Sequence, residues 1–194
     1  MIAAVLAAAT TAFGSFEPVA FEDPEPALAA LGPQQAGATA VTAWVGTPLH
    51  GVRIDHGLAG IVDVGLTVET WPGRFWRPSL QARVRALRTG PLQLLFRGTV
   101  GRALTTSSIL IPTSDGELAL QLGYAVLPRL AATIEGSFLG STDFTREHTA
   151  GFVQARGGLS FAPPGPFALI AAVGVLRGSR GSRAVGTGGA TFRF

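Results

Sequence analysis

The chain has 194 residues, of which 47% are hydrophobic and only 14% charged, and its formal net charge is +3. A soluble domain usually carries nearer a quarter charged residues, so the composition predicts a membrane protein or an unusually large core. The sequence contains no Cys, which excludes zinc–thiolate sites and cysteine nucleophiles. No apolar run approaches the about 18 residues of a membrane-spanning helix, so a membrane protein of this composition must cross with strands.

The first 37 residues predict an export signal followed by an irregular segment. Residues 1–14 hold an apolar stretch and then small residues, as secretory signal peptides do, and cleavage fits after Ala9 or Ala12. Residues 15–37 are acidic and contain four prolines, which prevent a continuous helix or strand. We expect this second segment to be a periplasmic stub, with room for a helical turn at 27–31.

From residue 38 to residue 194 the chain repeats one pattern, in which apolar and polar residues alternate along short runs. Leu118, Leu120 and Leu122, for example, alternate with Glu117 and Gln121. Such alternation predicts strands with one apolar face and one polar face. Eight strands are predicted near residues 61–70, 78–89, 92–104, 116–127, 129–140, 149–161, 167–177 and 183–194.

Residues 38–56 decide the number of strands. They also alternate, on both sides of Pro48. Bacterial single-chain barrels have an even number of strands, so this stretch adds two strands or none. We therefore predict an all-β fold, a closed antiparallel transmembrane β-barrel of ten strands, with eight as the alternative.

The predicted connections differ in length in a regular way. Short ones lie near 57–60, 89–91, 127–129 and 162–166, and longer ones at 71–77, 105–116, 141–148 and 178–182. Short periplasmic turns that alternate with longer external loops are typical of outer-membrane barrels. A soluble β-sandwich has no reason to sort its loops in this way.

The last residues carry a resemblance to a known family. The chain ends Ala190-Thr191-Phe192-Arg193-Phe194, and this strand resembles the assembly signal of bacterial outer-membrane β-barrel proteins. Phe194 matches the terminal aromatic residue and Phe192 the apolar position two before it. The resemblance implies a location in the outer membrane of a Gram-negative bacterium and insertion by the barrel-assembly machinery.

The polar faces of the predicted strands bring charges of both signs into the lumen. We expect a lumen charge cluster made of Asp63, Glu69, Arg83, Arg85, Arg97, Glu117, Glu135 and Arg156. Folding the strands about their loops places Asp63 opposite Arg85, and Arg83 opposite Arg97. Such a cluster fits a packed polar core that plugs a narrow barrel, or a narrow pathway that favours anions.

Enzymatic chemistry finds little support in the sequence. Only His50, His56 and His148 are present, and none lies at a recognisable spacing from a nucleophile. We predict no catalytic residues, no metal site and no cofactor. The alternatives left open are an outer-membrane barrel enzyme, either a lipid hydrolase or a protease, and a soluble secreted β-sandwich or lipocalin-like binder.

The function expected is that of a small outer-membrane barrel of structural or passive-transport type, and not an enzyme. All 15 basic residues are Arg and lie singly along the chain, so we expect no nucleic-acid binding. The expected partners are outer-membrane lipid and lipopolysaccharide, whose phosphates Arg180 and Arg183 would contact, together with the barrel-assembly machinery. We expect the protein to be a monomer.

Overall fold

The computed structural model describes residues 23–71, 75–105, 113–143, 148–179 and 181–194. The predicted signal peptide and Arg180 lie outside these residues. One helix, α2 (Pro26–Ala29), precedes the strands β1 (Thr39–Thr47), β2 (His50–Ala59), β3 (Val62–Trp71), β4 (Phe75–Thr89), β5 (Leu92–Thr105), β6 (Thr113–Leu127), β7 (Leu130–Asp143), β8 (His148–Phe161), β9 (Phe167–Gly178) and β10 (Gly181–Arg193).

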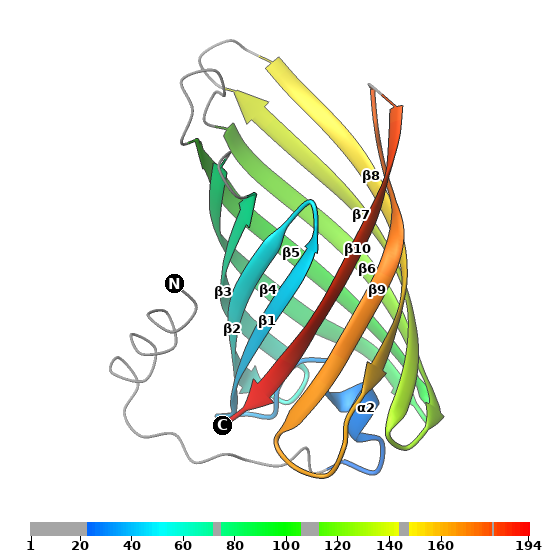
Figure 1. Cartoon of the computed structure of the whole chain (residues 1–194). Helices are drawn as coiled ribbons and strands as arrows, with labels where there is room; N and C mark the ends of the chain where they lie inside the picture. The colour runs from blue at the N-terminus through cyan, green and yellow to red at the C-terminus, as the bar shows by residue number, and fades with distance from the viewer. Residues whose placement is uncertain (1–22, 72–74, 106–112, 144–147, 180) are drawn as a thin grey trace.

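These ten strands form one closed antiparallel barrel (Figure 1). Each strand pairs with its neighbours in the chain, and β1 pairs with β10 to close the wall. At this seam the backbone of Thr39 both donates to and accepts from that of Phe194, at 3.1 and 2.7 Å. The prediction of ten strands is confirmed, because the stretch 38–56 supplies both β1 and β2.

The outer surface of the barrel is apolar. Among the described large hydrophobic residues the exposed fraction is highest at Val173 with 72%, Leu118 with 71% and Ile134 with 69%. The interior is polar, since five of the seven largest fully buried side chains among the described residues are Gln93, Thr42, Asp55, Asp63 and Ser160. A soluble protein shows the opposite arrangement, so the soluble sandwich or lipocalin-like alternative was wrong.

No described helix is long and apolar enough to cross a membrane.

The predicted difference in loop length between the two ends of the barrel holds only in part, because the outer connections at 48–49, 72–74 and 179–180 are no longer than the turns of the other end, and the long loop predicted at 178–182 was wrong. At one end the strands are joined at residues 60–61, 90–91, 128–129 and 162–166, and we call this the periplasmic end, because short turns face the periplasm in such barrels. Gly90 adopts a φ of +50° in one of these turns, a conformation that glycine accepts without steric cost. The predicted external loop 71–77 is shorter than expected, because β4 already begins at Phe75.

Three of the strand pairs contain an irregularity close to the periplasmic end. The register shifts between Gly57 and Ala59, between Arg85 and Leu87, and between Ala125 and Leu127. Such bulges insert an extra residue and increase the local twist. The three bulges change which side chains lie opposite each other in the periplasmic half of the barrel.

Candidate functional site

The periplasmic end of the lumen is filled by residues 23–37, which we call the N-terminal plug. Within it α2 contacts β6, β7 and β8, and the side chain of Leu28 is fully buried. Leu28 packs in a cluster with small residues of the barrel's lower end, namely Ala125, Ala131, Ala162 and Ala168. The segment predicted to be a periplasmic stub therefore lies, over these residues, against the inner wall.

Hydrogen bonds from the wall fix the backbone of the plug. The amide of Gln93 donates to the carbonyl of Leu28 at 3.3 Å, and Arg83 donates to the carbonyl of Leu31 at 3.3 Å. The backbone N–H of Gln34 donates to the Asp63 carboxylate at 3.1 Å. Buried backbone groups need such partners, so the wall satisfies the irregular stretch that follows α2.

Side chains hold the two ends of the plug. Arg88 makes two hydrogen bonds with the Asp23 carboxylate, at 2.7 and 2.6 Å. Arg193, on β10, donates to the side-chain oxygen of Gln35 at 2.6 Å. Together with the Leu28 contacts, these bonds tie the plug to strands on several sides of the barrel.

Above the plug, a first group of charges joins β2, β3 and β4. Arg83 donates to Asp63 at 3.0 and 2.5 Å, and to Asp55 at 3.0 Å. Asp55 also accepts from Arg53 at 2.7 Å and from the Gln81 amide at 2.6 Å. Both carboxylates are fully buried, and a buried charge needs partners of this kind to offset its desolvation.

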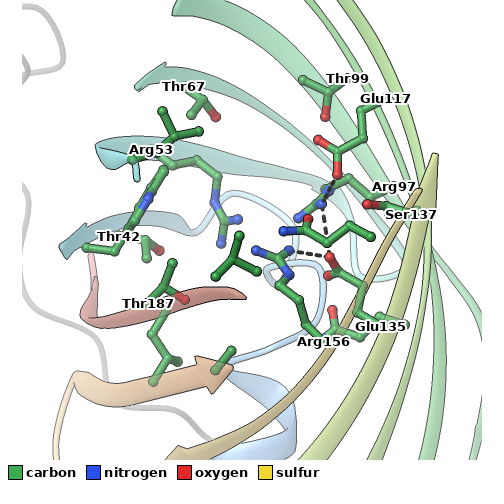
Figure 2. Close-up of a pocket in the computed structure, with 18 of the residues that line it drawn as sticks. Thr42, Arg53, Thr67, Arg97, Thr99, Glu117, Glu135, Ser137, Arg156 and Thr187 are labelled. Carbon is green, nitrogen blue, oxygen red and sulfur yellow. Dashed lines mark hydrogen bonds and ion pairs between the residues drawn. The ribbon is translucent and has the colours of Figure 1, made fainter. Parts of the chain in front are cut away.

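A second group of charges lies across the lumen on β5, β6, β7 and β8 (Figure 2). Arg97 donates to Glu117 at 2.7 Å and to Glu135 at 3.2 Å. Arg156 also binds Glu135. Nearer the outer end, Arg77 pairs with Glu69.

The charges in these groups balance. The ion pairs join five arginines (Arg53, Arg77, Arg83, Arg97 and Arg156) to five acids (Asp55, Asp63, Glu69, Glu117 and Glu135), so their sum is zero. A pathway that selects anions would need an excess of positive charge along the lumen. The balance favours the packed polar core among the two interpretations of the cluster.

The structure brings seven of the eight predicted lumen residues into these groups, and Arg85 is the exception. Arg85 donates to the carbonyl of Gly60 in the turn at the periplasmic end. The predicted pairing of Asp63 with Arg85 was wrong, because Asp63 lies opposite Arg83. The predicted pairing of Arg83 with Arg97 is confirmed.

Three charged residues of the network were not predicted. Arg53 and Asp55 lie on β2, where they alternate with Val52 and Ile54, and this alternation was the available signal. Arg77 had been assigned to a loop, and it lies inside β4.

The remaining wall of the lumen is largely uncharged. A cavity of about 270 Å³ lies above the plug, and it is lined on this side by Trp44 of β1, Ile170 and Leu176 of β9, and Val185 and Thr187 of β10. The strands β2 to β8 line the cavity with the charged groups and with Thr67 and Ser79. The lumen is thus a cup with one polar and one mainly apolar wall.

The two histidines with described side chains serve local contacts. His56 Nδ1 lies 3.0 Å from the hydroxyl of Thr39, and His50 Nδ1 accepts from the backbone N–H of Gly46 at 3.2 Å. Within the described part of the chain, no group of three His, Asp or Glu side chains could hold a metal ion. The side chain of His148 lies outside the described part.

Fold and surface together define the class of this protein. A closed antiparallel barrel with an apolar exterior leaves no strand edge exposed to lipid, which is the condition for spanning a membrane with strands. An even strand number with short turns at one end is the arrangement of bacterial outer-membrane barrels. The protein is a transmembrane β-barrel of the outer-membrane type.

No protein-family model and no curated protein matches the sequence. Solved structures with a similar fold include a loop-deletion mutant of OmpT, an outer-membrane protein of Vibrio cholerae, at 10% identity and a TM-score of 0.47. The match covers 75% of this chain but only 53% of that chain, so this chain spans about half the length of that neighbour.

Two further neighbours match over their whole length. The N-terminal barrel domain of Pseudomonas aeruginosa OprF is 14% identical, with a TM-score of 0.41 over 83% of this chain and 100% of that one. The KdgM porin, in complex with oligogalacturonate, is 13% identical, with a TM-score of 0.45 over 81% and 99%. At such values the likeness carries no argument about function, which has to be drawn from the lumen itself.

Proposed function

We propose that the protein is an outer-membrane barrel whose polar lumen is closed by a plug at the periplasmic end. It acts as a structural or binding barrel and not as an open pore or an enzyme. The observation that carries the proposal is the N-terminal plug. Its Leu28 side chain is fully buried among alanines of the lower end, and its backbone is bonded to Gln93, Arg83 and Asp63.

The ion-pair network supports the same conclusion. Arg83 on β4 pairs with Asp63 on β3 and with Asp55 on β2, along one side of the lumen, and its side chain is only 5% exposed. An ion that passed this level would have to displace charges that are already paired and desolvated, which is costly in a low-dielectric interior. The plug therefore closes the lower end of the lumen, and the network forms a second layer that lines the cavity above it.

Conductance in planar bilayers tests the proposal. We expect the wild-type barrel to show no steady open-pore current, because the plug blocks the lower end of the lumen. Leu28→Asp places a charge in the apolar cluster of the plug, and it should produce brief openings that the wild type lacks. Leu118→Ala, on the lipid face, is the matched control, because Leu118 is 71% exposed and touches neither layer. A steady open-pore current from the wild type would overturn the proposal.

A further inference from the structure

The barrel wall is lower at one place on its outer rim. The pairing of β1 with β10 stops at Thr47 and Gly186, whereas β10 continues to Gly181 and there pairs with β9 alone. In Figure 1 the β1–β2 hairpin ends well below the β9–β10 hairpin. We call this gap the notch, which is bounded by residues 181–185 of β10 and by the β1–β2 turn, residues 47–49.

The lower part of the notch lies at the height of the apolar belt. On the outer face of β9, Val173 and Val175 are 72% and 48% exposed and lie beside Gly186 and Ala184. The next outward side chain on β9 is Arg177, which belongs at or above the edge of the hydrocarbon layer. Lipid therefore reaches the notch directly.

A strand edge at this depth needs a covering. Among the described residues, β10 has no strand partner on the β1 side over residues 181–185, and of these Ala184 and Val185 lie below Arg177, at the depth of the apolar belt. Each unsatisfied backbone group in hydrocarbon costs several kcal/mol, so this edge must border water or a bound molecule. The cavity of the lumen supplies that space, since its lining includes Thr47, Pro48 and Leu49 as well as Val185.

The cavity behind the notch has the two kinds of surface that an amphiphile needs. Trp44, Ile170, Leu176 and Val185 give it an apolar side next to the notch. At about 270 Å³ its volume is near the lower end of ligand pockets, about 300–1,000 Å³. This size suits one hydrocarbon chain and not a lipid with several chains.

The part of the wall formed by β3 and β4, beside the β1–β2 hairpin, carries hydroxyl groups that have no hydrogen-bond partner within the described structure. Thr67 and Ser79 line the cavity, each is only 6% exposed, and neither hydroxyl has a hydrogen-bond partner among the described residues. Arg53 is bound to Asp55 through Nε, and in Figure 2 its guanidinium points into the cavity. Buried polar groups without partners are rare in proteins, and a carboxylate or phosphate would satisfy all three.

We infer that the notch and the cavity form a binding site for a single-chain amphiphile with an anionic head, which enters from the outer leaflet. Its chain lies along β9 and β10, and its carboxylate or phosphate accepts hydrogen bonds from Arg53, Thr67 and Ser79. The inference rests on the proposed plugged cup, because an open pore would let the amphiphile pass through.

The test uses the full-length folded barrel in phosphatidylcholine nanodiscs with cis-parinaric acid, a fluorescent fatty acid that accepts energy from tryptophan. We expect saturable energy transfer. Ala172→Trp fills the cavity from β9 and should weaken binding at least tenfold, whereas Ala171→Trp points to lipid on the same strand and should leave it within about twofold. The boiling-dependent gel shift shows that each variant is folded.

A second variant tests the head. Arg53→Gln should weaken binding of the acid about tenfold but leave its methyl ester unaffected. Displacement of the probe by dodecanoate, by lysophosphatidate, or by both identifies which head the site takes. Binding by the wild type that does not saturate, or equal losses in the two tryptophan variants, would overturn the inference. A barrel that shows no conductance and binds no probe would overturn the inference but leave the proposed function standing. A barrel that conducts would overturn the proposed function itself.

Discussion

Replacing Asp63 with Asn removes one buried negative charge with almost no change of shape. The Asp63 side chain is fully buried and accepts from Arg83 at 3.0 and 2.5 Å and from the Gln34 backbone at 3.1 Å. After the change Asp55 is the one carboxylate left to Arg83, and Arg53 also binds it. Removing one partner of a buried ion pair costs about 3–5 kcal/mol. Because Asp55 remains, we expect a loss near the lower limit, about 3 kcal/mol in the free energy of unfolding.

The assay is urea unfolding of the refolded barrel in phosphatidylcholine liposomes, followed by tryptophan fluorescence. The matched control is Asp115→Asn near the outer mouth, where the half-buried carboxylate accepts from Thr113 at 2.9 Å and the loss should stay within about 0.5 kcal/mol. Adding Arg83→Met to Asp63→Asn should restore part of the stability, because no unpaired charge remains. Equal losses in the two Asp variants would refute this account of the network.

Three further changes test the lipid face, the plug and the terminal strand. Val173→Arg puts a charge on a side chain that is 72% exposed on the lipid face, and we expect it to lower the free energy of unfolding in urea by about 2–4 kcal/mol. Ser182→Arg at the outer rim is the control and should lower it little. Equal losses in the two variants would contradict the placement of the membrane. Gly57→Val pushes a side chain into the backbone carbonyls of the plug, so we expect protease to cleave the plug. Gly136→Val has open space around it and should leave the plug resistant. Resistance of the plug in both variants would contradict its docking. Phe194→Ala should lower the yield in the outer-membrane fraction of cells without destabilising refolded barrel, and an unchanged yield would rule out the assembly role.

Much of the fold could be predicted because lipid imposes a simple rule on the strands. Every second residue has to be apolar, as at Leu118, Leu120 and Leu122, which are 71%, 44% and 41% exposed. The polar residues between them then have to face the lumen, which is why Glu117 and Glu135 were placed correctly. The same rule could have placed Arg53 and Asp55 on β2.

The register near the periplasmic end could not be predicted by counting from the loops. The bulge between Arg85 and Leu87 shifts the partners on β5 by one residue, and the sequence around it shows no break in its pattern. The pairing of Asp63 has a different cause: β4 already begins at Phe75, which pairs with Trp71, so the β3–β4 register is shifted by two residues from the predicted one and Arg83 lies opposite Asp63. Arg85 instead binds the Gly60 carbonyl in the turn.

The plug could not be predicted because its position depends on contacts with residues that are distant from it in the sequence. Its acidic, proline-rich composition has no periodicity that indicates a binding face. Leu28 packs against small residues at the periplasmic ends of the strands, including Ala125, Ala131 and Ala168. Alanine at such positions leaves room for a foreign side chain, but a single sequence does not show which segment occupies that room.

The way in which the plug is held determines how it can be released. If the plug leaves, Asp63 and Arg83 still have each other, so no buried charge loses its main partner. Release of the plug loses the burial of Leu28, about 1.5–3 kcal/mol for a side chain of this size, and the hydrogen bonds from Gln93 and Arg83 and to Asp63. The ion pair between Arg88 and Asp23 is partly exposed and contributes at most about 1 kcal/mol. Burial of Leu28 and the largely buried hydrogen bonds to Gln93, Arg83 and Asp63 therefore hold the plug, and raising the salt concentration, which screens exposed charges, should not release it.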